Sequence, residues 1–272
     1  MTSDITRRRA LGMISGLGIG AVLAACGEST SDASDSSSTP SSPTDATDAT
    51  SATTPTSATG STGDCTPIPE ETAGPYPGDG SNGVNVLTED GVVRSDIRAS
   101  FGDLSGTAEG VPLSIELTVV DASDGCVPLA GAAVYLWHCD REGRYSLYSD
   151  GATDQNYLRG VQEADGNGIV RFSSIFPACY SGRWPHIHFE VFPDLATATS
   201  AGQPLATSQL ALPADVCDVV YATDGYSQSI SNVAQTSLST DNVFADDGAA
   251  RQLATTSGNV SDGYTAVLTV SV

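Results

Sequence analysis

The sequence predicts an all-β protein, a single β-sandwich domain with long functional loops, preceded by a signal peptide and a disordered linker. Several short segments after Cys65 alternate apolar and polar residues, as half-buried strands do. No segment carries a long helical period with capping residues. All nine tyrosines, both tryptophans and all three histidines lie after Cys65, so the core-forming residues are gathered there. We therefore expect one sandwich domain over residues 65–272.

The first 25 residues predict an export signal. An arginine cluster at residues 7–9 stands directly before an apolar run, residues 10–25, that is too short and too rich in glycine to span a membrane permanently. An arginine pair followed by Leu11 is typical of the twin-arginine pathway. The run ends in Leu-Ala-Ala-Cys at Cys26, which resembles a bacterial lipobox. We expect an exported protein that is lipid-anchored to the outer face of the cell membrane, or secreted; an ordinary signal peptide with an unrelated cysteine is the alternative.

Residues 26–64 predict a linker. They are almost wholly Ser, Thr, Ala, Asp, Pro and Gly, and they include no aromatic residue. Such a composition cannot bury enough apolar surface to offset the entropy that is lost on ordering. We expect a disordered tether that takes no part in the chemistry.

Five segments of the domain predict strands, because they alternate apolar and polar residues or are rich in residues that pack on a pleated surface. Turn signals containing glycine, Asp124-Gly125 and Gly166-Asn167-Gly168, stand between some of them. In chain order, the predicted strands cover residues 113–120, 132–137, 169–172, 186–192 and 265–272. The sequence shows no internal repeat.

The charge pattern excludes some partners. The chain has no lysine, and its 33 acidic residues against 11 basic ones give a formal net charge of −22. A surface of this kind argues against nucleic acid and against an anionic membrane face as partners. Contact with a membrane is expected only through the lipid on Cys26.

The cysteines suggest disulfides. With Cys26 lipidated, five remain; export permits them to pair, and the odd number leaves at least one thiol free. No two have the close spacing of a structural metal site. We predict disulfides Cys65–Cys126 and Cys179–Cys217, with Cys139 as a buried thiol.

The strongest local signal for chemistry lies in residues 183–189, Arg-Trp-Pro-His-Ile-His-Phe. In a strand, His186 and His188 project from the same face while Ile187 packs on the other. Burying two imidazoles without partners would be costly, and these are two of only three histidines in the chain. We therefore interpret them as part of a metal site.

The remaining donors are left open by the residues alone. Zinc would call for a third histidine, a cysteine or a carboxylate, and non-haem Fe(II) for a carboxylate. The neighbouring loops instead offer Tyr180, six residues before His186, and Tyr145. A phenolate is a hard anionic donor that favours a highly charged cation such as Fe(III), and tyrosine ligation of iron has a precedent. A tyrosine taken singly, however, is more often a core residue with its hydroxyl satisfied.

Taken together, the pattern resembles the intradiol ring-cleaving dioxygenases, a family that opens catechols with Fe(III). The resemblance covers roughly residues 65–221, and its motifs stand in the family's order. They are Thr72-Ala73-Gly74-Pro75-Tyr76, Arg94-Ser95-Asp96-Ile97-Arg98, Pro128-Leu129-Ala130-Gly131-Ala132, Trp137-His138-Cys139-Asp140, Gly143-Arg144-Tyr145-Ser146, Leu158-Arg159-Gly160, Gly168, Tyr180, Arg183, His186-Ile187-His188 and Gln209-Leu210. The Trp-His-Cys-Asp motif is similar to that of the secreted branch of the family.

This resemblance implies a function and a set of site residues. It implies that a catechol and O2 are the substrates, that the ring opens between the two hydroxylated carbons, and that a muconate-type diacid forms. Arg183 would stabilise negative charge that develops on the substrate, Gln209 would lie near the substrate, and Tyr180 would take up a substrate proton. His138 is interpreted as a structural histidine. The implied ligands of Fe(III) are Tyr145, Tyr180, His186 and His188.

Two other functions fit parts of the pattern. A cell-surface β-sandwich binding module that retains a decayed iron site is the alternative, but it would have no reason to keep all four donors together with Arg183. A copper or zinc hydrolytic site on the two-histidine strand lacks a third nitrogen or a carboxylate at suitable spacing. The sequence therefore favours an iron enzyme.

Overall fold

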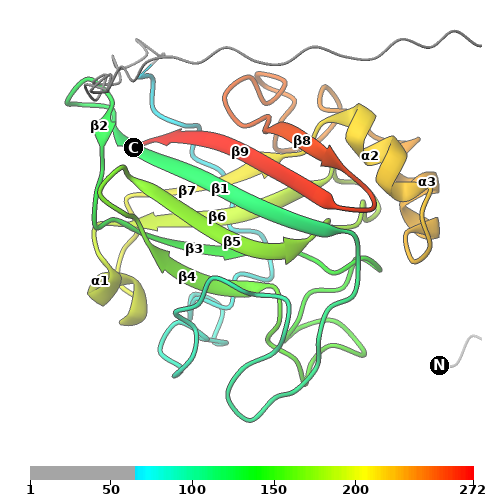
Figure 1. Ribbon diagram of the computed structural model, residues 1–272, viewed down its shortest axis with the longest axis horizontal. Helices are drawn as coiled ribbons and strands as arrows, with labels where there is room; N and C mark the ends of the chain where they lie inside the picture. The colour runs from blue at the N-terminus through cyan, green and yellow to red at the C-terminus, as the bar shows by residue number, and fades with distance from the viewer. Residues whose placement is uncertain (1–64) are drawn as a thin grey trace, which may run out of the picture. The chain divides into compact units, whose positions relative to one another are not determined.

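The structure, a computed structural model, describes residues 65–272. Two β-sheets lie face to face, as Figure 1 shows, so the predicted all-β sandwich is confirmed. The predicted signal peptide (residues 1–25), the lipidation site Cys26 and the linker (residues 26–64) lie outside the described residues.

The first sheet is built around β1 (Pro112–Asp121), which pairs in parallel with β9 and antiparallel with β2 and β5. Its apolar residues Leu113, Ile115 and Leu117 are buried in the core between the sheets, while the polar residues between them are half-buried. This is the period of two that a half-buried strand requires. The other strands of the sheet are β2 (Val127–Pro128), β5 (Ile169–Ile175), β8 (Thr255–Asn259) and β9 (Gly263–Ser271).

The second sheet is antiparallel and buried on both faces at its centre. Its strands, in spatial order, are β4 (Arg159–Glu163), β3 (Ala133–Trp137), β6 (His186–Phe192) and β7 (Ala206–Ala211). Every residue of β3 and β6 is buried. Ile187, Phe189 and Val191 join the core between the sheets, so His186 and His188 project from the opposite face of β6.

That opposite face is covered by a second hydrophobic cluster. Val86 and Leu87, from the N-terminal segment of the domain, belong to the same cluster as Tyr135 and Trp137 of β3. The fully buried guanidinium of Arg159 ties this cover to the sheet: it donates to Pro77 O (2.7 Å), Tyr76 O (2.9 Å), Tyr135 Oη (3.0 Å), Ser146 Oγ (3.0 Å) and Ser146 O (3.0 Å). The histidines therefore lie under a layer of loops that is fixed in place.

Three short helices complete the domain: α1 (Leu195–Thr199), α2 (Ala214–Tyr221) and α3 (Ser227–Val233). Figure 1 shows α2 and α3 side by side at one end of the sandwich, and α1 at the other. Within residues 65–272, none of the helices has the length and apolar character needed to cross a membrane.

All five predicted strands are present, as β1, β3, β5, β6 and β9. The strands β2, β4, β7 and β8 were not predicted. β2 has two residues, the others have five or six, and β8 is a largely exposed edge strand of sequence Thr-Thr-Ser-Gly-Asn. Such strands are specified by pairing with their neighbours and carry little apolar periodicity of their own.

The disulfide prediction is half right. Cys65 and Cys126 form a disulfide, and Cys139 is a buried thiol, as expected. The predicted bond between Cys179 and Cys217 is wrong, since both are free and buried. The two thiols face different partners: Cys179 Sγ donates to the backbone oxygen of Arg183 (3.4 Å), whereas Cys217 interacts with Tyr221 of its own helix. Burial raises the pKa of Cys179 to about 12, so it is held as a thiol.

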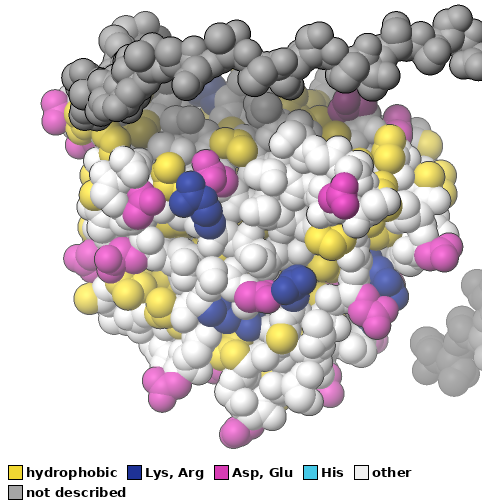
Figure 2. Space-filling view, in the orientation of Figure 1, with side chains coloured by type: hydrophobic (Ala, Val, Ile, Leu, Met, Phe, Trp, Pro, Cys, Tyr) yellow, Lys and Arg dark blue, Asp and Glu magenta, His cyan; other side chains and the backbone are white. Residues whose placement is uncertain are grey.

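The surface is acidic, in line with the composition. Figure 2 shows acidic side chains scattered over one face of the molecule with few arginines between them, and no histidine is visible there. All three histidines are buried, each with 2–3 % of its surface exposed. Their chemistry therefore belongs to the interior.

Candidate active site

The two histidines of β6 point at one place. The distance between His186 Nε2 and His188 Nε2 is 3.1 Å. The other ring nitrogen of His186, Nδ1, lies 2.6 Å from the backbone oxygen of Trp184, which is the usual way in which a metal-binding imidazole is held in orientation. The bond from Nδ1 leaves the lone pair of His186 Nε2 free, and two Nε2 atoms so close together could form one side of a cation site.

Two tyrosines complete this cluster from loops. Tyr180 Oη lies 3.2 Å from His186 Nε2. The ring of Tyr145 lies 5.9 Å from that of Tyr180 and 6.2 Å from that of His188, measured between centroids. The hydroxyl of Tyr145 is buried and has no hydrogen-bond partner, which is uncommon for a buried phenol. The structure thus brings together all four side chains that the sequence singled out.

The electrostatics of the cluster follow from its burial. Burial raises the pKa of Tyr180 to about 12 and holds the pKa of Tyr145 well above its ordinary value. Burial, reinforced by Arg183, lowers the pKa of His186 to about 3; burial and the neighbouring His186 hold the pKa of His188 well below its ordinary value. The imidazoles are therefore neutral, which is the form that binds metals. The phenols would ionise only beside a strong positive charge.

These donors fit a highly charged cation. Within residues 65–272, no group of three or more His, Cys, Asp or Glu side chains is placed to hold a metal. The two histidines therefore find no carboxylate or thiol partner there, and the tyrosines are the remaining donors. Two phenolates beside a trivalent ion reduce the net charge that has to be buried, and the unpartnered Tyr145 hydroxyl is already directed into the interior.

His188 is held by two residues whose roles the sequence did not reveal. Trp137, its partner across β3 and β6, stacks on the imidazole with ring centroids 4.9 Å apart and planes 6° apart. On the other side, Gly74 adopts a φ of +70°, and a Cβ there would lie 3.4 Å from His188 Cε1. Both residues stand in motifs of the sequence, but only their packing against His188 shows what they do.

Arg183 and Gln209 lie beside the cluster. Arg183 Nη1 is 3.4 Å from His186 Nε2, and Nη2 donates to Gln209 Oε1 at 2.6 Å. Gln209 is fully buried, pairs with His188 in the register of β6 and β7, and donates from Nε2 to Thr72 O at 2.8 Å. The third nitrogen of the guanidinium, Nε, donates to the buried carboxylate of Asp241 at 2.9 Å. The sequence did not indicate this partner.

A cavity opens onto the cluster. Its volume is about 560 Å³, within the usual range for small-molecule sites. Tyr76 forms part of the wall and packs against Tyr145 with ring centroids 5.0 Å apart. The residues that line the cavity are Thr72, Gly74, Pro75, Tyr76, Gly143, Tyr145, Ser149, Tyr180, Arg183 and Asn242. Its mixture of aromatic and polar groups suits a small aromatic ring that carries hydroxyl groups.

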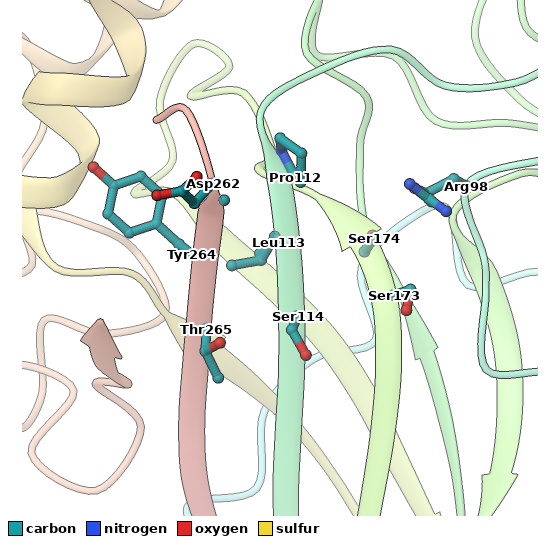
Figure 3. A pocket seen from close by; sticks show the side chains of 10 residues that line it. Arg98, Pro112, Leu113, Ser114, Ser173, Ser174, Asp262, Tyr264 and Thr265 are labelled. Atoms are coloured by element: carbon teal, nitrogen blue, oxygen red, sulfur yellow. The ribbon is translucent and has the colours of Figure 1, made fainter. Parts of the chain in front are cut away.

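A second hollow, of about 230 Å³, lies over the ends of β1, β5 and β9 (Figure 3). None of the four side chains of the cluster (Tyr145, Tyr180, His186 and His188) lines this hollow. Arg98, labelled at its edge, is paired with Asp96 at 2.6 Å in an exposed position. Such a pair contributes little, and Asp262 is the one carboxylate that lines the hollow.

His138, the third histidine, is structural, as predicted. Its Nδ1 lies 2.8 Å from Cys139 O and its Nε2 lies 2.7 Å from Ser174 Oγ. Both ring nitrogens are thus satisfied by the protein itself, which leaves no lone pair for a metal.

Comparisons with known proteins agree on one family. Residues 95–244 match the family model described as Dioxygenase. A solved structure, an intradiol ring-cleavage dioxygenase from Tetranychus urticae, is similar with a TM-score of 0.59 and 27% identity, over 76% of this chain and 94% of that one.

Two curated proteins are similar over shorter stretches. Hydroxyquinol 1,2-dioxygenase of Corynebacterium glutamicum is 33% identical over 116 residues, 35% of this chain and 37% of that protein. Chlorocatechol 1,2-dioxygenase of Rhodococcus opacus is 38% identical over 53 residues, 20% of this chain and 21% of that protein. This chain thus matches well under half the length of either one.

Proposed function

This chain belongs to the intradiol ring-cleavage dioxygenase family, and on that premise we propose that it opens catechol-type rings between the two hydroxylated carbons. The substrates are a catechol and O2, and both oxygen atoms enter the product, a muconate-type diacid. Atoms and electrons balance without an external reductant. The observation that supports the proposal is the meeting of two buried histidines with buried Tyr145, half-buried Tyr180 and Arg183, the last three of which line one cavity.

We assign the ligands of iron to Tyr145, Tyr180, His186 and His188. When bound there, Fe(III) would supply a Lewis acid that draws electron density from the ring of a catecholate. The choice of Fe(III) rests on the donors: phenolate oxygens are hard anions, and they favour a trivalent ion over Fe(II), which is typically bound by two histidines and a carboxylate.

The protein's own groups prepare the substrate. The cavity is large enough for a small aromatic ring, which would lie beside Tyr76, Tyr145 and Tyr180 in its wall. Tyr180 lines this cavity, so its phenolate oxygen would be placed to accept a proton from a catechol hydroxyl. Arg183, aimed at the same place, stabilises the negative charge that the ring gains as it reacts. Gln209 fixes one edge of Arg183.

Product analysis tests this function. Purified, iron-loaded protein is mixed with catechol in air-saturated buffer, and O2 uptake and products are measured. We expect O2 and catechol to be consumed in equal amounts, with a colourless diacid as product. A yellow semialdehyde, formed by opening the ring beside the hydroxyls, would contradict the intradiol assignment. Absence of O2 uptake with every catechol tried would favour the binding module.

A further inference from the structure

Asp241 is a fully buried carboxylate that holds Arg183 against the site. It comes from the segment after α3, far along the chain from the histidine strand. Its Oδ2 accepts from Arg183 Nε (2.9 Å) and from the backbone N–H of Trp184 (2.6 Å). Its Oδ1 accepts from the backbone N–H groups of Val243 (2.8 Å) and Phe244 (3.1 Å). Four donors thus fix the carboxylate in one position.

The carboxylate in turn fixes the direction of the guanidinium. With Nε bound to Asp241 and Nη2 bound to Gln209, the remaining nitrogen, Nη1, is the one that lies 3.4 Å from His186 Nε2. The ring of Phe244, from the same turn as Asp241, lies 5.8 Å from Arg183 Cζ and limits movement on that side. A flexible arginine is therefore held with one edge toward the place where substrate would react.

We propose that Asp241 is a positioning residue, which keeps Arg183 oriented so that its charge acts on the substrate as the ring becomes electron-rich. This inference rests on the proposed function. A charged donor that is already oriented requires no reorganisation during the reaction, which is the property that makes such groups effective. Burial alone would raise the pKa of Asp241, but hydrogen bonds from Arg183 and the backbone hold it below its ordinary value, so the carboxylate stays ionised.

The same carboxylate also caps a turn by accepting from the backbone N–H groups of Val243 and Phe244. Two substitutions separate this capping role from the positioning of Arg183. Asp241→Ser keeps a short acceptor for the backbone N–H groups but is too short to pair with Arg183. Asp241→Asn keeps the shape but loses the charge. Asp165→Asn is the matched control, since Asp165 also caps a turn through two backbone N–H groups and lies near an arginine, Arg171, away from the site.

The kinetic experiment is a double-mutant cycle with Arg183→Ala in the iron-loaded protein. We expect either Asp241 variant to lower kcat by about 10- to 100-fold, with iron content and anaerobic catechol affinity close to wild type. In the Arg183→Ala background, the same Asp241 substitutions should change kcat little further. A wild-type kcat in both Asp241 variants, or an equal loss with and without Arg183, would overturn the proposal.

A chemical measurement keeps this inference separate from the proposed function. Phenylglyoxal modifies free guanidinium groups, and peptide mass spectrometry reports its rate at Arg183 even in a protein without activity. We expect Arg183 to react several-fold faster in Asp241→Ser than in wild type, at temperatures where thermal unfolding shows both to be folded, and at the wild-type rate in the Asp165→Asn control. An unchanged rate in Asp241→Ser would show that Asp241 does not hold the arginine, whatever the protein catalyses.

Discussion

At the residue scale, His186 and His188 share a face because successive residues of a strand alternate, and Ile187 between them packs into the core between the sheets. Each imidazole is then held by a different device. A backbone oxygen holds the ring of His186, and stacking on Trp137 holds that of His188. The buried hydroxyl of Tyr145 has no hydrogen-bond partner in the protein, and leaving it so is costly unless it binds a ligand.

Ligand substitutions test the proposed metal site at this scale. We expect His188→Ala to lose iron outright, because no carboxylate or thiol stands near enough to replace it within residues 65–272. Iron per folded protein is measured by elemental analysis. Tyr145→Phe and Tyr180→Phe should bleach or shift the visible tyrosinate-to-iron absorption even where some iron is retained.

The control for this series is His138→Gln, because His138 is equally buried but hydrogen-bonded at both ring nitrogens by the protein. It should retain iron at the wild-type level. Full iron occupancy in His188→Ala would remove His188 from the set of ligands.

At the scale of elements, the candidate site is assembled from segments that are distant in the chain. The strand β6 supplies two donors, loops after β3 and β5 supply the tyrosines, and β7 supplies Gln209. The N-terminal segment of the domain closes over them through Gly74 and the buried Arg159 clamp. This segment is anchored at its start by the disulfide Cys65–Cys126 and by the hydrogen bond from Ile68 N to Ser271 O (2.9 Å).

The disulfide is therefore expected to stabilise the cover of the site. Cys126→Ser opens a link across 61 residues of sequence, and loop-closure entropy puts the expected loss in the free energy of unfolding at about 4 kcal/mol. Urea unfolding measures it. Reductant should weaken wild type to a similar extent and leave the variant unaffected.

A Cys126→Ser variant as stable as wild type would show that the disulfide adds nothing to the free energy of unfolding.

A count of thiols tests the assignment of the cysteines. Unreduced, denatured protein should expose three free thiols from this domain, those of Cys139, Cys179 and Cys217.

At the scale of the whole molecule, the net charge bears on how the protein reaches the cell surface. A lysine-free chain with a net charge of −22 has little affinity for polyanions, so we propose that its place at the cell surface depends on the lipid and the export signal rather than on surface charge. An enzyme delivered folded by the twin-arginine route would acquire its iron before export. The acidic surface would also favour release of the dianionic product that we propose.

Membrane fractionation tests the anchor. Cys26→Ala should move the protein from the membrane fraction to the soluble fraction, since one lipidated cysteine is the proposed attachment. Ser29→Ala, three residues further on, should stay with the membrane. If Cys26→Ala remains bound to the same extent as wild type, the assignment of the anchor is wrong.

Some of this molecule is determined by neighbouring residues alone. Alternation or local composition predicted β1, β3, β5, β6 and β9, and the His186–Ile187–His188 alternation placed both imidazoles on one face, because these local patterns require no knowledge of a strand's partners. The family motifs added Tyr145, Tyr180, Arg183 and Gln209, which the structure brings together; their roles remain proposals.

Tertiary structure decided the rest. It left Cys179 and Cys217 unpaired in a shared core, built β8 from a polar edge segment, and brought Asp241 to Arg183 across 58 residues of sequence. These outcomes depend on which surfaces pack together, because a long-range contact is set by the packing and hydrogen bonding of the whole domain and leaves no periodic trace in the residues that make it.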